Sequence, residues 1–137
     1  MQNVFVYGTL RAGEINDIRE AAARHDIEEP TLVGVSVVRG RLFDFGAYPG
    51  LVIDDEPGVD VRGDVYAIDD ALVAVLDEIE EVYPGVEGLF RAREVTVEVD
   101  GEAVTCRFYP VGKESVGGLP EIVCGDWVQH RKTRRRR

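Results

Sequence analysis

The sequence predicts a single α+β domain that is rich in strands and carries one or two helices. Its 137 residues suit one domain, and 45% of them are hydrophobic, which is enough for a real core. Short runs of β-branched and aromatic residues alternate with turns that contain Gly, Pro or Asp. One longer segment has the apolar spacing of a helix instead. Because no repeat or linker interrupts this pattern, we expect one folded unit.

The first half of the chain predicts mainly strands. Residues 3–7 are rich in β-formers and stop at Gly8, as a buried strand does when it ends in a tight turn. Residues 14–28 are charged and rich in alanine, and they form either a helix or an irregular excursion that Pro30 stops. Further β-rich runs follow at residues 32–38, 51–53 and 61–68. Gly63, in the last of them, indicates a bulge or a close approach of another backbone.

The clearest helix is predicted over residues 70–81. Asp69 or Asp70 can cap its first turn. Its apolar residues recur with the spacing of one stripe along a helix: Leu72, Val75, Leu76 and Ile79. We expect this stripe to face the core and most of the acidic residues around it to face solvent.

A β-hairpin is predicted after this helix. Residues 93–99 alternate valine with polar residues, and residues 103–109 form a second β-rich run. Asp100-Gly101 between them is a strong signal for a type I′ turn. The chain then predicts a loop that reaches Gly125-Asp126-Trp127.

Charge is distributed unevenly along the chain. The net charge is −10, and the last seven residues hold six basic side chains, which leaves −16 for residues 1–130. We therefore expect a folded domain over residues 1–130 and a basic, disordered tail over residues 131–137. So acidic a domain repels a phosphate backbone, and we do not expect it to bind nucleic acid.

The sequence predicts a cytoplasmic protein with no membrane segment and no metal. No apolar run approaches the roughly 20 residues that a membrane helix needs, and no signal region precedes the first strand. The two cysteines, Cys106 and Cys124, are too few for a disulfide scaffold, so we expect two buried thiols. His25 and His130 do not complete the paired spacing of a structural zinc site.

Two segments have the residue types that chemistry needs. The first is the YGTL turn, which consists of Tyr7, Gly8, Thr9 and Leu10. Glycine lets backbone amides turn outward, and a row of N–H groups can hold a carboxylate or a developing oxyanion. A strand followed by glycine is also an ordinary turn, so this pattern alone is weak.

The second segment is the acidic end of the predicted helix. At about 100° per residue, Asp77 and Glu81 fall nearly opposite the apolar stripe. Glu80 lies at one edge of the stripe, and Glu78 at the other edge is the alternative. A carboxylate half-sunk in apolar surroundings has its charged form disfavoured, which makes it a better general base near neutral pH. Glu80 is therefore the first candidate.

Together, these and other motifs resemble the γ-glutamylcyclotransferase-like, or AIG2-like, family. Five blocks carry the resemblance in the same order, at residues 4–11 (VFVYGTLR), 48–52 (YPGLV), 61–68 (VRGDVYAI), 76–80 (LDEIE) and 125–127 (GDW). They span residues 3–127, which is nearly the whole chain. The resemblance implies a γ-glutamylcyclotransferase-like fold, with a mixed β-barrel-like core, one or two packed helices and a substrate cavity at one end.

The resemblance also implies a reaction, the intramolecular aminolysis of a γ-glutamyl amide or amine to 5-oxoproline and a free amine. Such an enzyme is a transferase or lyase that needs no cofactor and takes a small γ-glutamyl substrate. Glu80 is implied as the general acid and base, and the YGTL turn (Tyr7, Gly8, Thr9 and Leu10) as the amide donors. Tyr109 on the late strand is implied as a lining residue of the pocket. Phe90 and Glu81 depart from the family pattern, which has a tyrosine and a glycine there.

Two alternatives from other functional classes stay open. The same cavity could hold a small acidic metabolite without turnover, because a fold does not fix a function. The Arg-rich tail could instead contact nucleic acid or anionic lipid.

Overall fold

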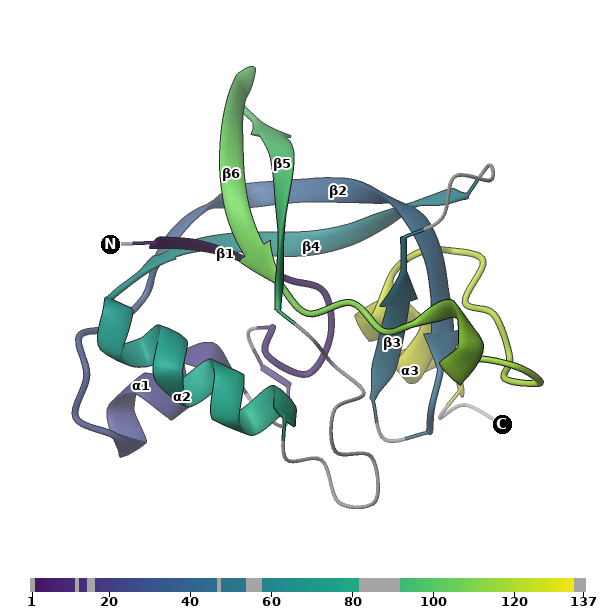
Figure 1. Ribbon diagram of the computed structural model, residues 1–137, viewed down its shortest axis with the longest axis horizontal. Helices are drawn as coiled ribbons and strands as arrows, with labels where there is room; N and C mark the ends of the chain where they lie inside the picture. The colour runs from purple at the N-terminus through teal and green to yellow at the C-terminus, as the bar shows by residue number, and fades with distance from the viewer. Residues whose placement is uncertain are drawn as a thin grey trace.

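The computed structural model describes residues 2–11, 13–14, 17–46, 48–53, 58–81 and 92–134, with the backbone alone at 79–81 and 134. The elements follow one another in Figure 1 as β1 (Gln2–Val6), α1 (Ile18–Arg24), β2 (Thr31–Asp44), β3 (Pro49–Val52), β4 (Val59–Ile68), α2 (Asp70–Glu81), β5 (Arg93–Val99), β6 (Glu102–Phe108), the 3₁₀ turn η1 (Lys113–Ser115) and α3 (Trp127–Arg134). This arrangement confirms the predicted α+β class, although the described residues form three α-helices where one or two were expected.

One six-stranded sheet organises the fold, in the order β3-β2-β4-β1-β6-β5. β1 runs antiparallel to β4, with Phe5 opposite Val65, and parallel to β6, with Val4 opposite Arg107. Within the described ranges no pairing joins β3 to β5, so the sheet is open and "barrel-like" describes it only loosely. The β5–β6 hairpin passes in front of the paired strands β2 and β4 and rises above them in Figure 1.

The sheet is covered on both faces at its centre. Successive side chains of β1 point to opposite faces, as in any strand. Val4 and Val6 pack in one core cluster with Ile18 of α1 and Leu72 of α2. Phe5 and Tyr7 pack in the other cluster with residues of β2, β5 and β6 and with Trp127 of α3. β1 is therefore buried on both faces, and the YGTL turn that follows it starts in the middle of the molecule.

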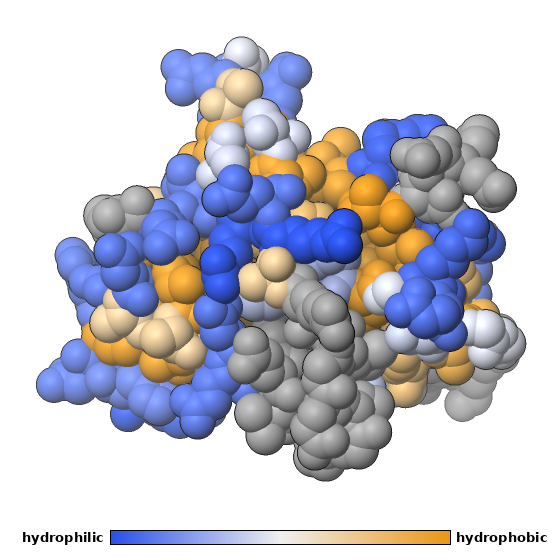
Figure 2. Space-filling view, in the orientation of Figure 1, coloured by the Kyte–Doolittle hydropathy of each residue, from blue (hydrophilic) through white to orange (hydrophobic). Residues whose placement is uncertain are grey.

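The open sheet leaves part of β2 uncovered. Its exposed apolar side chains are Leu32, Val33, Val35 and Val37. Figure 2 shows apolar surface beside the base of the β5–β6 hairpin, whereas the tip of the hairpin is mainly polar and the surface over α1 and α2 mixes polar and apolar residues. Apolar side chains stay exposed on β2 because the sheet does not close over them.

Two local predictions are confirmed. The helix predicted over residues 70–81 is α2, with the same bounds. Asp100 and Gly101 have φ values of 51° and 84°, and they join β5 to β6 with Val99 opposite Glu102. Positive φ at both central residues is what a type I′ hairpin turn requires.

Two other predictions need correction. Cys106 is buried, and burial raises the pKa of its thiol to about 11, but Cys124 is exposed. The second correction concerns the tail, because α3 continues through residues 131–134. The basic run is therefore helical over its first four residues, while residues 135–137 lie outside the described part. No helix in the described ranges has the length and apolar character needed to cross a membrane.

Gly63 confirms the predicted close backbone approach. A Cβ atom there would lie 2.5 Å from the Val6 carbonyl oxygen and 2.6 Å from the Phe5 ring. We expect Gly63→Ala to lower the free energy of unfolding by about 2 kcal/mol, because β4 and β1 cannot separate without breaking their ladder. Urea unfolding measures this loss. Gly117→Ala is the control, since its Cβ would meet no atom within 4 Å, and equal stability losses in the two variants would contradict the explanation.

Candidate functional site

The YGTL turn leaves β1 between β4 and β6 and is buried throughout. Tyr7, Thr9 and Leu10 are 4–6% exposed. The Arg11 amide donates to the Gly8 carbonyl at 3.1 Å and closes the turn, and the Ile18 amide donates to the Leu10 carbonyl at 2.9 Å. A Cβ at Gly8 would lie 2.7 Å from the Pro49 ring, so only glycine fits beneath the start of β3. The turn is thereby fixed between β3 and α1.

The Tyr7 side chain joins three parts of the site. Its hydroxyl donates to the Tyr109 carbonyl oxygen at 2.6 Å and accepts from the Leu51 amide at 3.2 Å. Both contacts are buried, where a satisfied hydrogen bond matters more than at the surface. The structure thus brings together Tyr7 and Tyr109, which the sequence had singled out separately.

Tyr109 connects the turn to α2. It is 4% exposed, and its hydroxyl donates to the Asp77 carboxylate at 2.5 Å. Arg107 donates to the same carboxylate through two nitrogens, at 3.0 Å and 2.7 Å. Burial, together with the hydrogen bond to Asp77, raises the pKa of Tyr109 far above its ordinary value. Tyr109 therefore stays a hydrogen-bond donor at any physiological pH.

Asp77 differs from its prediction. The sequence assigned it to the solvated face of the helix, but its side chain is only 29% exposed and accepts three hydrogen bonds from the end of the late strand. The apolar stripe of a helix shows what one side of it packs against, and it says nothing of a strand that crosses another side. The LDEIE block at residues 76–80 was the available signal for Asp77, but the resemblance implied a role only for its last residue, Glu80.

Glu80 lies in the last turn of α2, three residues after Asp77. The described side chains of this helix end at Glu78, so the predicted role of the Glu80 carboxylate stays a prediction. Glu78, the alternative base, is exposed. Phe90 lies outside the described residues, and of Glu81 only the backbone is described.

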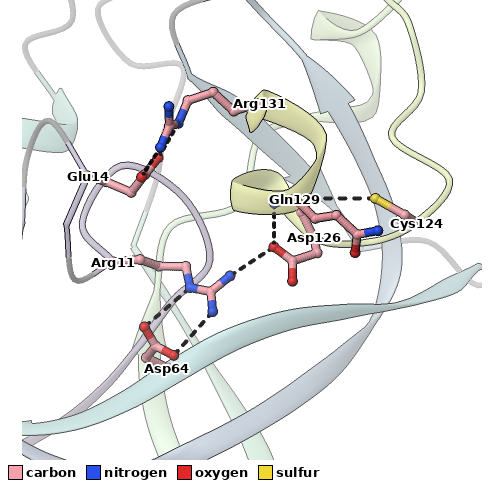
Figure 3. Close-up of polar contacts among 7 residues, drawn as sticks. All are labelled: Arg11, Glu14, Asp64, Cys124, Asp126, Gln129 and Arg131. Carbon is pink, nitrogen blue, oxygen red and sulfur yellow. Dashed lines mark hydrogen bonds and ion pairs between the residues drawn. The ribbon is translucent and has the colours of Figure 1, made fainter. Parts of the chain in front are cut away.

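A second network secures the YGTL turn from the other side (Figure 3). The Arg11 guanidinium, just after the turn, pairs with Asp64 of β4 at 3.2 Å and with Asp126 at 3.2 Å. These three side chains are 12–17% exposed. The contact joins the first and last motifs of the resemblance across 115 positions. Sequence reasoning named both motifs but had no signal for their contact.

Glu14 and Arg131 form a further ion pair in Figure 3. Two guanidinium nitrogens donate to the carboxylate at 2.9 Å and 2.7 Å, and the Glu14 side chain is 4% exposed. This bidentate geometry is the strong form of the Arg–carboxylate contact. The pair favours the continuation of α3 into the basic run, because the buried Glu14 carboxylate requires the positive charge of Arg131 beside it.

Arg131→Met should lower the free energy of unfolding by about 2 kcal/mol, since it leaves the buried Glu14 carboxylate without its partner. The exposed neighbour Lys132 provides a matched control, and we expect Lys132→Met to change stability by less than about 0.5 kcal/mol. Thermal or urea unfolding of both variants gives the comparison. Equal losses of stability in the two variants would mean that Arg131 contributes only through its charge at the surface and not through its pairing with Glu14.

No described group of three or more His, Cys, Asp or Glu side chains is arranged to hold a metal ion. The polar groups around the turn instead form hydrogen bonds with one another. This arrangement combines a buried turn with two tyrosines, Tyr7 and Tyr109, whose hydroxyls are held by hydrogen bonds, the second of them to Asp77 near the end of α2.

Comparison with known proteins identifies the family to which the chain belongs. The sequence model of the family described as "Gamma-glutamyl cyclotransferase, AIG2-like" matches residues 4–129. A Vibrio cholerae protein, provisionally named a gamma-glutamylcyclotransferase, is 41% identical over 81 residues, which are 58% of this chain and 62% of that protein. The gamma-L-glutamyl-butirosin B gamma-glutamyl cyclotransferase of Niallia circulans is 32% identical over 135 residues, which are 96% of this chain and 78% of that enzyme.

Solved structures agree with the fold. YkqA from Bacillus subtilis superposes with a TM-score of 0.73 at 26% identity, over 99% of this chain and 43% of YkqA. A mouse AIG2-like protein superposes with a TM-score of 0.69 at 26% identity, over 88% of this chain and 84% of that protein. The chain thus spans less than two thirds of the length of the Vibrio cholerae and Bacillus subtilis relatives.

Proposed function

Because the chain belongs to the gamma-glutamyl cyclotransferase, AIG2-like family, we propose that it converts a γ-glutamyl amide or amine to 5-oxoproline and a free amine. The observation that carries this proposal is a chain of two hydrogen bonds. Tyr7 donates to the Tyr109 carbonyl, and the Tyr109 hydroxyl donates to Asp77 in the last turns of α2. They link the YGTL turn to the helix that carries Glu80.

In the proposed reaction, the α-nitrogen of the γ-glutamyl group attacks its own γ-carbonyl carbon. The new C–N bond closes a five-membered lactam, and the bond from that carbon to the leaving amine breaks. Glu80 takes a proton from the α-ammonium and later returns one to the departing amine, so no co-reactant is consumed. The nucleophile and the carbonyl are already in one molecule, which leaves the protein mainly to orient them.

The YGTL turn is assigned the stabilisation of the oxyanion. Charge develops on the γ-carbonyl oxygen as the ring closes, and preorganised backbone amides stabilise such charge most effectively in a buried site. Burial of Thr9 and Leu10, together with the closed hydrogen bonds of the turn, supports this role. Tyr109 is assigned to the wall of the pocket.

The test is 5-oxoproline release from a panel of γ-glutamyl compounds. The panel contains γ-glutamyl amino acids, γ-glutamyl-ε-lysine, γ-glutamyl polyamines and γ-L-glutamyl-butirosin B, the compound in the name of the Niallia circulans relative. Release from at least one compound, in step with the free amine, is expected. Tight binding of a compound without release would instead favour a protein that binds a small metabolite at the same site.

A further inference from the structure

The described side-chain hydrogen bonds of Asp77 all come from β6 and from Tyr109, which follows that strand. Its carboxylate accepts from the Arg107 side chain of β6 and from the hydroxyl of Tyr109. The Asp77 and Arg107 side chains are each 29% exposed, and Tyr109 is 4% exposed. The Arg107 guanidinium also lies 6.0 Å from the centre of the Tyr109 ring. Three side chains thus form one compact, half-buried group.

The end of α2 has an electrostatic reason to need this group. The carboxyl end of a helix is the negative pole of its dipole, and acidic residues there are unfavourable. The last turns of α2 nevertheless contain four acidic residues and no basic one. Arg107 supplies from β6 the positive charge that the helix lacks.

The group also reaches the YGTL turn. The hydroxyl of Tyr109 donates a hydrogen bond to Asp77, and the backbone carbonyl of Tyr109 accepts one from the Tyr7 hydroxyl. The Tyr7 oxygen in turn accepts the Leu51 amide of β3. Two hydrogen bonds, joined through the covalent frame of Tyr109, therefore connect the last turns of α2 to the first residue of the turn.

We propose that Asp77 is a positioning residue, which fixes the last turn of α2, and with it Glu80, relative to the YGTL turn through Tyr109 and Arg107. Residues three apart on a helix are neighbours on its surface, so the anchor lies within one turn of the base. This proposal rests on the proposed function, because it assigns Asp77 a role through Glu80. Asp77 itself transfers no proton.

The first test is Asp77→Asn in the full chain. An asparagine side chain has nearly the same shape, but it carries no charge and its NH₂ group replaces one of the two acceptor oxygens, so the anchor loses its charge and at least one of its three hydrogen bonds. We expect kcat for 5-oxoproline release to fall by about 100-fold, a loss that a displacement of about 1 Å can cause, while KM changes by less than about threefold. Glu102→Gln removes a charge from an exposed position at the other end of β6 and should leave both constants at the wild-type value.

Two further variants separate positioning from general stability. Asp77→Glu keeps the charge and should restore part of kcat. Tyr109→Phe should lower kcat, and the double variant Asp77→Asn with Tyr109→Phe should be no slower than the slower single variant, because both weaken the same anchor. Full additivity of the two single losses would overturn the proposal.

Hydrogen exchange gives a readout that does not depend on turnover. Asp77→Asn should speed exchange of the backbone amides in the last turn of α2 by at least about tenfold and leave β4 unchanged. Unchanged exchange at that turn, or a wild-type kcat in Asp77→Asn, would overturn the role of Asp77 even where Glu80→Gln is inactive. Absence of release from every compound by the wild type would instead reject the proposed function.

Discussion

Glu80→Gln is expected to reduce 5-oxoproline release by about 10³-fold, the middle of the range that a general acid or base contributes. Glutamine keeps the size of the side chain but cannot accept a proton from the α-ammonium of the substrate. Binding of the γ-glutamyl compound should persist, since the YGTL amides and Tyr109 are unchanged. The measurement is kcat for the best compound of the panel, beside KM or a directly measured Kd.

Glu78→Gln decides between the two carboxylates that the helix pattern proposed. Glu78 is exposed, and we expect its replacement to leave kcat at the wild-type value. An unaltered thermal unfolding curve for Glu80→Gln establishes that the loss is chemical. The assignment fails should Glu80→Gln turn over normally while Glu78→Gln does not.

The second large effect is expected at Arg11. Arg11→Met should lower the free energy of unfolding by about 3 kcal/mol, because it leaves the carboxylates of Asp64 and Asp126 without their cation in a mostly buried site. Both carboxylates are less than one fifth exposed. The same substitution should lower the temperature at which 5-oxoproline release is lost, since Arg11 directly follows the YGTL turn.

Arg39 provides the comparison for Arg11. It pairs with Asp60 at 3.3 Å, but the two side chains are 66% and 58% exposed. Arg39→Met should therefore cost less than about 1 kcal/mol, as is usual for surface ion pairs. Urea unfolding of both variants measures the difference, and a loss at Arg11 no greater than that at Arg39 would show that the buried network contributes little.

Local signals in the sequence predicted local structure well. Asp100 and Gly101 specify their own turn through their φ preferences, and the apolar stripe of α2 needs only its own residues to be read. The close approach of another backbone at Gly63 was equally predictable, because a glycine inside a β-rich run indicates that there is no space for a side chain. These features depend on a few neighbouring residues, and the structure has them where they were expected.

Contacts between distant segments account for what the sequence did not predict. Arg107 reaches Asp77 because β6 lies parallel to β1, a pairing for which no nearby residue gives a signal. The basic run was expected to be solvated, yet Arg131 holds a carboxylate 117 positions away. Asp77 and Arg131 were both assigned to solvent for the same reason, since a charged residue does not reveal a distant partner of opposite charge.

The Glu14–Arg131 pair has a consequence for how the protein is made. The ribosome adds about 5 to 20 residues per second, so the cation that completes this pair follows its carboxylate by about 6 to 23 s. Arg11 waits almost as long for Asp126, across 115 positions. The YGTL turn is thus synthesised well before the residues that complete its packing, and a nascent chain can give this turn its final surroundings only after Asp126 and Arg131 have been added.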